Sequence, residues 1–161
     1  MWKKIIILSG FMLVLSTGRA QQKLSVDTLF NEYGLLHGSV MITLGKDVLG
    51  NHTLIDEYKC LMMQAESEPA QRIETAIRRD YERRERSGKG TVIKEIRRNG
   101  HLRNASYALG KDRVSSVAEY ILYSRHDNKI TLVYLSGSFP AGQLDGELNK
   151  LKNLFIKINR K

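Results

Sequence analysis

The residues of this sequence that could do chemistry most directly are its four histidines. They are His37, His52, His101 and His126, and no two stand at a metal-binding spacing such as H-x-H or H-x-x-x-H. A metal site needs three or four converging ligands that further hydrogen bonds hold in place. Each histidine falls in or beside a predicted turn, so we expect solvated side chains. A hydrolase or metal-dependent enzyme whose residues converge only in the fold stays open as an alternative.

The second chemical candidate is Cys60, the one cysteine of the chain. It stands between Tyr58 and Met62 on one face of a predicted strand. A nucleophilic cysteine needs an adjacent base and an electropositive, partly open site. An apolar strand face offers neither, so we expect Cys60 to be a small buried hydrophobic residue. One cysteine forms no internal disulfide, and the hydrophobic core must therefore hold the fold.

Carboxylate pairs offer no reaction centre. Asp56 and Glu57 are neighbours on a predicted strand, so their side chains point to opposite faces. Asp145 and Glu147 are expected on the solvent side of a helix. Two catalytic carboxyl groups must instead face each other across a cleft, about 5 to 9.5 Å apart. The serines also lack the G-x-S-x-G and S-x-x-K contexts of known nucleophiles. We therefore predict that the protein is not an enzyme and needs no cofactor.

An arginine-rich helix between Ser67 and Gly88 is the one feature that suggests a binding function. Proline is tolerated in the first turn and serine can cap it. Ala70, Ile73, Ala76, Ile77 and Tyr81 form its apolar stripe. The residues proposed as a surface for an anionic partner are Arg72, Arg78, Arg79, Arg83 and Arg86. Arginine suits bidentate contact with carboxylate or phosphate, and Arg84 could join this surface.

Acidic residues on the same helix support a competing interpretation. Glu74, Asp80, Glu82 and Glu85 stand between the arginines and would neutralise much of their field. The spacing of four favours ion pairs between Glu74 and Arg78 and between Glu82 and Arg86. A solvated face laced with salt bridges is the usual meaning of such alternation.

Periodicity predicts the elements that must position these residues. Three predicted helices carry apolar residues three or four apart and span residues 22–33, 67–87 and 144–158. Six predicted strands span residues 39–44, 53–62, 91–98, 101–109, 119–125 and 129–135. Asn99-Gly100 suits the type I′ turn of a hairpin, and His126-Asp127-Asn128 makes a second tight turn. A turn-rich connection is expected over residues 45–51.

The order of these elements predicts an α+β domain. We expect a mostly antiparallel sheet of about six strands with helices packed mainly on one face. Both faces of residues 130–135 are apolar or nearly so, which favours a central strand.

The first twenty residues predict a cleavable signal peptide. Lys3 and Lys4 precede an apolar core, and Gly18 and Ala20 suit the cleavage site. The apolar run is shorter than the roughly 20 residues of a membrane span, and Arg19 would interrupt one. We expect residues 21–161 to form a single exported domain, periplasmic or extracellular in a Gram-negative bacterium. The loss of Lys3, Lys4 and Arg19 would lower the formal net charge from +9 to +6.

Several patterns together carry a resemblance. They are the Ala20-Gln21-Gln22 junction, Leu29-Phe30, residues 39–45, Tyr58-Lys59, and residues 129–137 leading into a leucine-spaced helix. In these features the chain resembles a family of small exported proteins of unknown function from Bacteroides-type bacteria. The resemblance implies a periplasmic or surface location and an α+β fold, and it carries over no catalytic residue.

The sequence therefore predicts an exported, non-enzymatic domain that binds a protein or anionic partner at the cell envelope. Export makes nucleic acid a poor partner, and any membrane contact is expected to be peripheral. The contact would use a sheet edge or the basic helix. A subunit of a larger envelope complex is a further alternative, and the sequence leaves the oligomeric state open.

Overall fold

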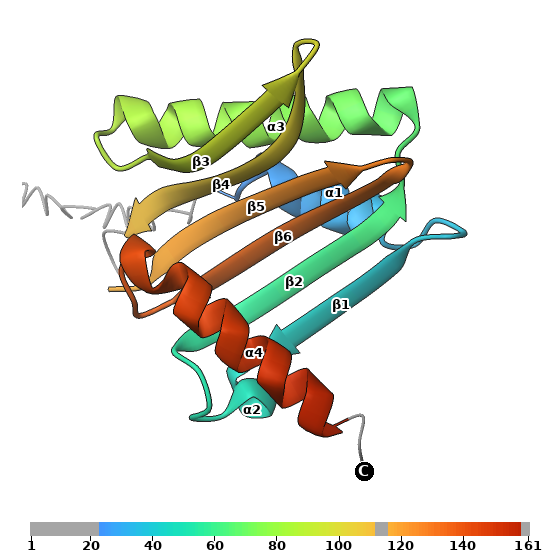
Figure 1. Ribbon diagram of the computed structural model, residues 1–161. Coiled ribbons are helices and arrows are strands. Elements are labelled where there is room, and N and C mark those ends of the chain that lie inside the picture. The colour runs from blue at the N-terminus through green and yellow to red at the C-terminus, as the bar shows by residue number, and fades with distance from the viewer. Residues whose placement is uncertain (1–22, 112–115, 159–161) are drawn as a thin grey trace, which may run out of the picture.

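The computed structural model describes residues 23–111 and 116–158, which form one twisted sheet with helices on both faces (Figure 1). The predicted signal peptide, residues 1–20, and its cleavage point lie outside the described residues. The strands are β1 (Val40–Gly45), β2 (Ile55–Gln64), β3 (Thr91–Arg98), β4 (His101–Lys111), β5 (Ala118–His126) and β6 (Lys129–Gly137). Every neighbouring pair is antiparallel, in the order β1-β2-β6-β5-β4-β3. The predicted α+β class and six-stranded antiparallel sheet are confirmed.

β6 is a central strand, as its apolar residues on both faces predicted. It lies between β2 and β5. Leu132 and Tyr134 belong to the hydrophobic cluster on one face of the sheet, and Val133 and Leu135 belong to the cluster on the other. A strand that is apolar on both sides requires cover on both sides.

The helices are divided between the two faces more evenly than expected. They are α1 (Ser25–Tyr33), α2 (Lys46–Leu49), α3 (Ser67–Arg86) and α4 (Leu144–Ile158). α1 and α3 supply buried residues to the first cluster, whereas α2 and α4 supply them to the second. α4 crosses its face of the sheet obliquely, next to β2 and β1 (Figure 1). α2 stands within the expected turn-rich connection. No helix in the described part of the chain is long and apolar enough to cross a membrane.

The tight turns are confirmed, whereas the serine cap predicted for the helix at Ser67 is not. Asn99 and Gly100 have φ of 53° and 77° in the β3–β4 hairpin, as a type I′ turn requires. Ser25 and Ser67 are the first helical residues of α1 and α3, and no side-chain cap comes from the residue before either one. The free N–H groups of α1 are instead bound by a carboxylate of α3, described below.

Candidate functional site

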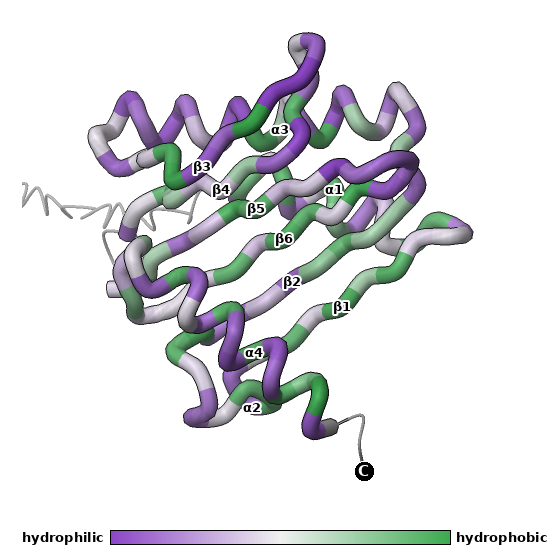
Figure 2. Tube along the Cα trace, in the orientation of Figure 1, coloured by the Kyte–Doolittle hydropathy of each residue, from purple (hydrophilic) through white to green (hydrophobic). Residues whose placement is uncertain are grey.

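The arginines of α3 do not surround the helix; most of them lie along one side. Arg72, Arg79, Arg83 and Arg86 are separated by seven, four and three residues, which places them on one side of a helix of 3.6 residues per turn. At a rise of about 1.5 Å per residue the row is roughly 21 Å long. We call these four residues the basic stripe. In Figure 2 the tube of α3 is largely purple, with green confined to a few positions.

α1 packs beside the basic stripe and is fixed to α3 at both ends. The fully buried Asp80 carboxylate accepts hydrogen bonds from the N–H groups of Ser25 and Val26, at 2.8 and 3.0 Å. At the other end of α1, Arg72 donates to both oxygens of Glu32 at 2.6 and 2.8 Å. The Glu32 pKa is lowered by this hydrogen bond. α1 therefore runs antiparallel to α3.

A groove of about 620 Å³ opens along these two helices. Its polar lining includes two hydroxyl residues of α1 and one of α3, together with three cations: Ser25, Thr28, Thr75, Lys23, Arg72 and Arg79. Glu68 also lines the groove and lies 3.8 Å from Arg72. Lys23 and Arg79 have no ion-pair partner among the described residues. The groove thus combines surplus positive charge with hydroxyl donors.

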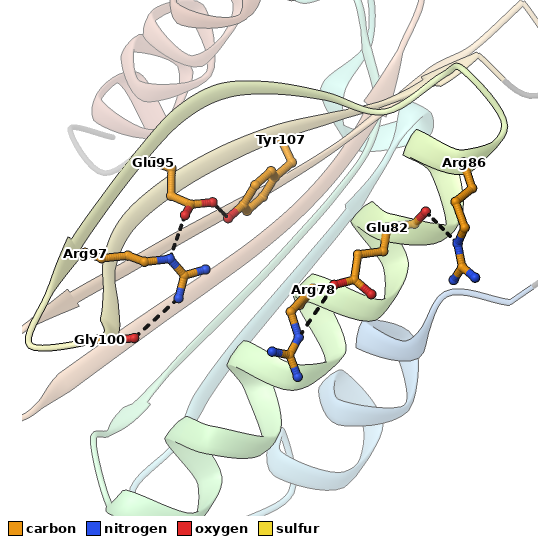
Figure 3. A network of polar contacts seen from close by, with 7 residues as sticks. All are labelled: Arg78, Glu82, Arg86, Glu95, Arg97, Gly100 and Tyr107. Atoms are coloured by element: carbon orange, nitrogen blue, oxygen red, sulfur yellow. Dashed lines mark hydrogen bonds and ion pairs between the residues drawn. The ribbon is translucent and has the colours of Figure 1, made fainter.

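The opposite flank of α3 faces the β3–β4 hairpin across a smaller crevice of about 220 Å³. There the charged groups bind one another (Figure 3). Tyr107 donates to Glu95, which also accepts from Arg97 at 2.6 Å, and Arg97 donates to the carbonyl of Gly100 at 3.4 Å. The Tyr107 hydroxyl and then Arg97 hold the pKa of Glu95 below its usual value. We call this side the hairpin flank.

The structure brings only part of the predicted arginine surface together. Arg79 and Arg83 have no ion-pair partner among residues 23–111 and 116–158, and Arg86 donates to the main-chain carbonyl of Glu82 at 3.2 Å. Arg72 is exposed but engaged by Glu32. Arg78 lies on the hairpin flank, 3.8 Å from Glu82 (Figure 3).

Four expectations about α3 were wrong. Arg84 does not join the surface, because it turns inward to a largely buried ion pair with Glu119 at 2.5 Å. Asp80 forms no ion pair with the arginines, because its buried carboxylate accepts the N–H groups of α1. The predicted pair of Glu82 and Arg86 is absent, because the Glu82 carboxylate lies by Arg78 and Arg86 binds the Glu82 carbonyl. The predicted pair of Glu74 and Arg78 is replaced by a hydrogen bond from the Leu102 N–H to Glu74, at 3.2 Å. The sequence did contain a signal for Asp80, which stands three and four residues after Ile77 and Ala76 on the buried side of the helix.

The chemical candidates stay apart. Within the described residues, no three or more His, Cys, Asp or Glu side chains are placed to hold a metal ion. Cys60 is buried, as predicted, and burial raises the pKa of its thiol. Glu147 was expected in solvent but is buried: it accepts the Leu54 N–H at 2.7 Å and Lys150 at 2.6 Å. Burial alone would raise the Glu147 pKa, but these partners outweigh it and hold the pKa below its usual value. Glu147 thus joins α4 to the start of β2.

Lys23, Thr28 and Thr75 were missed because their meeting depends on how α1 packs against α3. The basic stripe itself could have been found from the spacing of its arginines around the helix. The sequence gives no signal for the structural role of Glu32, and for Asp80 it gives only the position on the buried side of the helix.

Fold and site together define a small α+β domain with a row of arginines along α3, beside α1. The chain belongs to a family of unknown function, DUF6108, whose profile matches residues 13–148. No curated protein matches the sequence. The chain is similar to the solved structure of PA94, a protein of unknown function from Pseudomonas aeruginosa. The two are 13% identical over 74% of this chain and 83% of that chain, with a TM-score of 0.35. A likeness of this size carries no argument about function.

Proposed function

We propose that this protein is an exported, non-enzymatic domain that binds an anionic partner at the cell envelope through the basic stripe and its groove. One observation carries the proposal. On one side of α3, Arg79 and Arg83 have no ion-pair partner among the described residues, whereas Arg84, the next residue along, is paired inside the fold. Cations that the fold does not use remain available to phosphate, sulfate or carboxylate groups.

Binding to a soluble polyanion tests this proposal. Immobilised heparin would be titrated with the wild type and with the double variant Arg79→Ala/Arg83→Ala. We expect the variant to bind about tenfold or more weakly and to lose binding at lower salt, because exposed charges are screened over about 10 Å at 0.1 M ionic strength. The matched control is Lys152→Ala/Lys157→Ala, which removes the same charge from exposed positions of α4 on the other face of the sheet. Equal weakening by both double variants would mean that net charge, and not the stripe, governs binding.

Export is tested separately by N-terminal sequencing of the protein recovered from its own cells. We expect the chain to begin at Gln21, which can cyclise and block Edman degradation, so mass spectrometry of the N-terminal peptide is the suitable measurement. A protein that retains Met1 in the cytosolic fraction would contradict this part of the proposal.

A second candidate function is a subunit of an envelope complex, and the sheet edge favours it. All eight residues of β3 are exposed, among them Val92, Ile93 and Ile96, which are 40 to 48% exposed. An edge strand presents unpaired N–H and C=O groups to another chain. Two bulges interrupt the pairing of β3 with β4 and count against a long added strand. Cross-linking in the envelope fraction through a photoreactive residue at Ile93 should trap a partner if this candidate is correct.

A further inference from the structure

An exposed apolar pair follows directly after α1. Leu35 is 90% exposed and Leu36 is 49% exposed. Single exposed leucines are common on protein surfaces, but two adjacent ones at a loop tip form a compact apolar protrusion. Neither side chain belongs to the two hydrophobic clusters of the sheet.

The loop is built so that it holds these leucines away from the core. The Ser39 hydroxyl lies 2.7 Å from the carbonyl oxygens of both Tyr33 and Leu36, and the Leu36 N–H donates to Tyr33 at 3.2 Å. Gly34 sits so close to α1 that a Cβ would stand 2.6 Å from the carbonyl oxygen of Phe30 and would overlap the Met41 side chain. Local hydrogen bonds and a close approach thus define the loop, and Leu35 and Leu36 stay outside both hydrophobic clusters.

The apolar pair follows α1 at the end of that helix that lies near Arg72. The Arg72 guanidinium lies 5.4 Å from the ring centre of Tyr33 and is paired with Glu32. Leu35 is only two residues beyond Tyr33. Because α1 runs antiparallel to α3, the chain leaves α1 at the Arg72 end, and the remaining arginines of the stripe extend away from it.

A row of cations that ends in exposed leucines matches the chemistry of an anionic lipid surface. Cations near such a surface each strengthen binding about fivefold, and an apolar side chain can enter the boundary between headgroups and acyl chains. A soluble polyanion would satisfy the arginines but would leave Leu35 and Leu36 in water. The apolar pair therefore favours lipid over polysaccharide or polyphosphate.

We propose that the α1–α3 face docks on a bilayer containing anionic phospholipid, with the basic stripe at the headgroups and Leu35 and Leu36 in the interface. The inference rests on the proposed function, because it names the anionic partner of the same stripe. Docking is peripheral: the apolar contribution comes from two side chains and the remainder comes from charge.

Cosedimentation with lipid vesicles tests the inference. The chain used begins at Gln21, because all six strands and both hydrophobic clusters of the described residues lie after that position. Vesicles of phosphatidylcholine alone are compared with vesicles that contain one third phosphatidylglycerol. We expect binding to the anionic vesicles to be about tenfold or more stronger than to the neutral ones, and to weaken with salt.

Two double variants separate lipid docking from simple anion binding. Leu35→Ser/Leu36→Ser should weaken binding to anionic vesicles about tenfold or more, because each apolar side chain loses its burial, while binding to heparin stays unchanged. Arg79→Glu/Arg83→Glu should weaken both. The matched control, Lys152→Glu/Lys157→Glu in α4, should retain most of both, and circular dichroism verifies that each variant is folded.

The outcomes distinguish the two proposals. The proposal of lipid docking is wrong if Leu35→Ser/Leu36→Ser binds anionic vesicles as tightly as the wild type does. It is also wrong if the wild type binds neutral vesicles as tightly as anionic ones. In either case the proposed function still depends on the heparin result. If Arg79→Glu/Arg83→Glu binds both anionic vesicles and heparin like the wild type, both proposals fail.

Discussion

The two flanks of α3 both carry charged side chains, but these side chains have different partners. On the hairpin flank, Glu95 accepts hydrogen bonds from Tyr107 and Arg97, and Glu74 accepts one from the Leu102 main chain. On the flank beside α1, Arg72 is paired with Glu32, but Arg79 has no ion-pair partner in the described part of the chain. Arginines without a partner among the described residues thus lie on the α1 side of the helix, whereas Arg78 and Arg97 on the hairpin flank are paired.

This difference explains why net charge along the helix is a poor guide to its function. Counted in sequence, the acids nearly balance the arginines. In space, the Asp80 carboxylate accepts two main-chain N–H groups of α1, and Glu74 accepts one from β4. These two acids therefore form no ion pair with the arginines that the sequence places around them. Fixed charges that the structure has not paired are the ones that attract a partner.

The largest expected effect comes from neighbouring arginines with opposite roles. Arg84→Ala removes a charged hydrogen-bond donor from the 7% exposed Glu119 carboxylate, which Tyr134 also binds, and we expect a loss of about 3 kcal/mol in the free energy of unfolding. Arg83→Ala, one residue away in the basic stripe, should change it by no more than about 0.5 kcal/mol. Urea denaturation of the two variants measures both values. Similar losses in the two would mean that the stripe is structural.

Asp80 gives the next largest effect. Asp80→Ala removes the acceptor of two N–H groups at the start of α1, which we expect to cost about 2 kcal/mol and to loosen α1 first. Hydrogen exchange at Ser25 and Val26 should quicken more than exchange in β5 and β6. The control Glu82→Ala removes only an exposed contact with Arg78 and should change stability by less than about 0.5 kcal/mol. Unchanged exchange in α1 would show that Asp80 does not hold this helix.

The framework of the fold could be predicted from local signals. Asn99-Gly100 defined its hairpin because both positions need positive φ, and residues 130–135 predicted a central strand because both of their faces are apolar. These signals lie within a few residues of the structure that they determine.

The candidate site depended on contacts that are distant in sequence. The carboxylate of Asp80 acts 54 and 55 residues away, on the N–H groups of Val26 and Ser25. Glu147 acts 93 residues away, on Leu54. The position of Asp80 on the apolar side of α3 indicated its burial, but the helix alone could not identify the main-chain groups that these carboxylates bind.

A substitution of Tyr107 on the hairpin flank should give a smaller loss of stability. Tyr107→Phe removes the hydroxyl that donates to Glu95, and we expect a loss of about 1 kcal/mol at neutral pH. The Glu95 pKa should move back toward its usual value of 4.5. A carboxyl whose pKa is lowered by folding stabilises the protein above its usual pKa, and this stability is lost as the pH falls through the folded-state pKa. The difference in the free energy of unfolding between the wild type and Tyr107→Phe should therefore become smaller below pH 4.5. Urea denaturation at a series of acidic pH values measures it.

The control for Tyr107 is the matching hydroxyl on α3. Tyr81 donates to Glu85 at 2.9 Å, but this pair is exposed, and Tyr81→Phe should cost less than about 0.5 kcal/mol at any pH. If the loss of unfolding free energy in Tyr107→Phe is the same at every pH, the contribution of the Tyr107 hydroxyl does not depend on the ionisation of Glu95.

The smallest expected effect is a gain of function on the α1 flank. Glu32 holds Arg72 in a bidentate pair, so among the described residues Arg72 is the member of the basic stripe that a carboxylate already neutralises. Glu32→Gln should release Arg72 and strengthen binding to heparin or anionic vesicles about threefold, somewhat less than a full additional cation contributes. Asp145→Asn raises the net charge equally at an exposed position of α4 and should leave binding nearly unchanged. Titrations of the two variants at one salt concentration give the comparison directly. If both variants strengthen binding to the same extent, the position of the charge does not matter, and the two flanks of α3 do not differ in function.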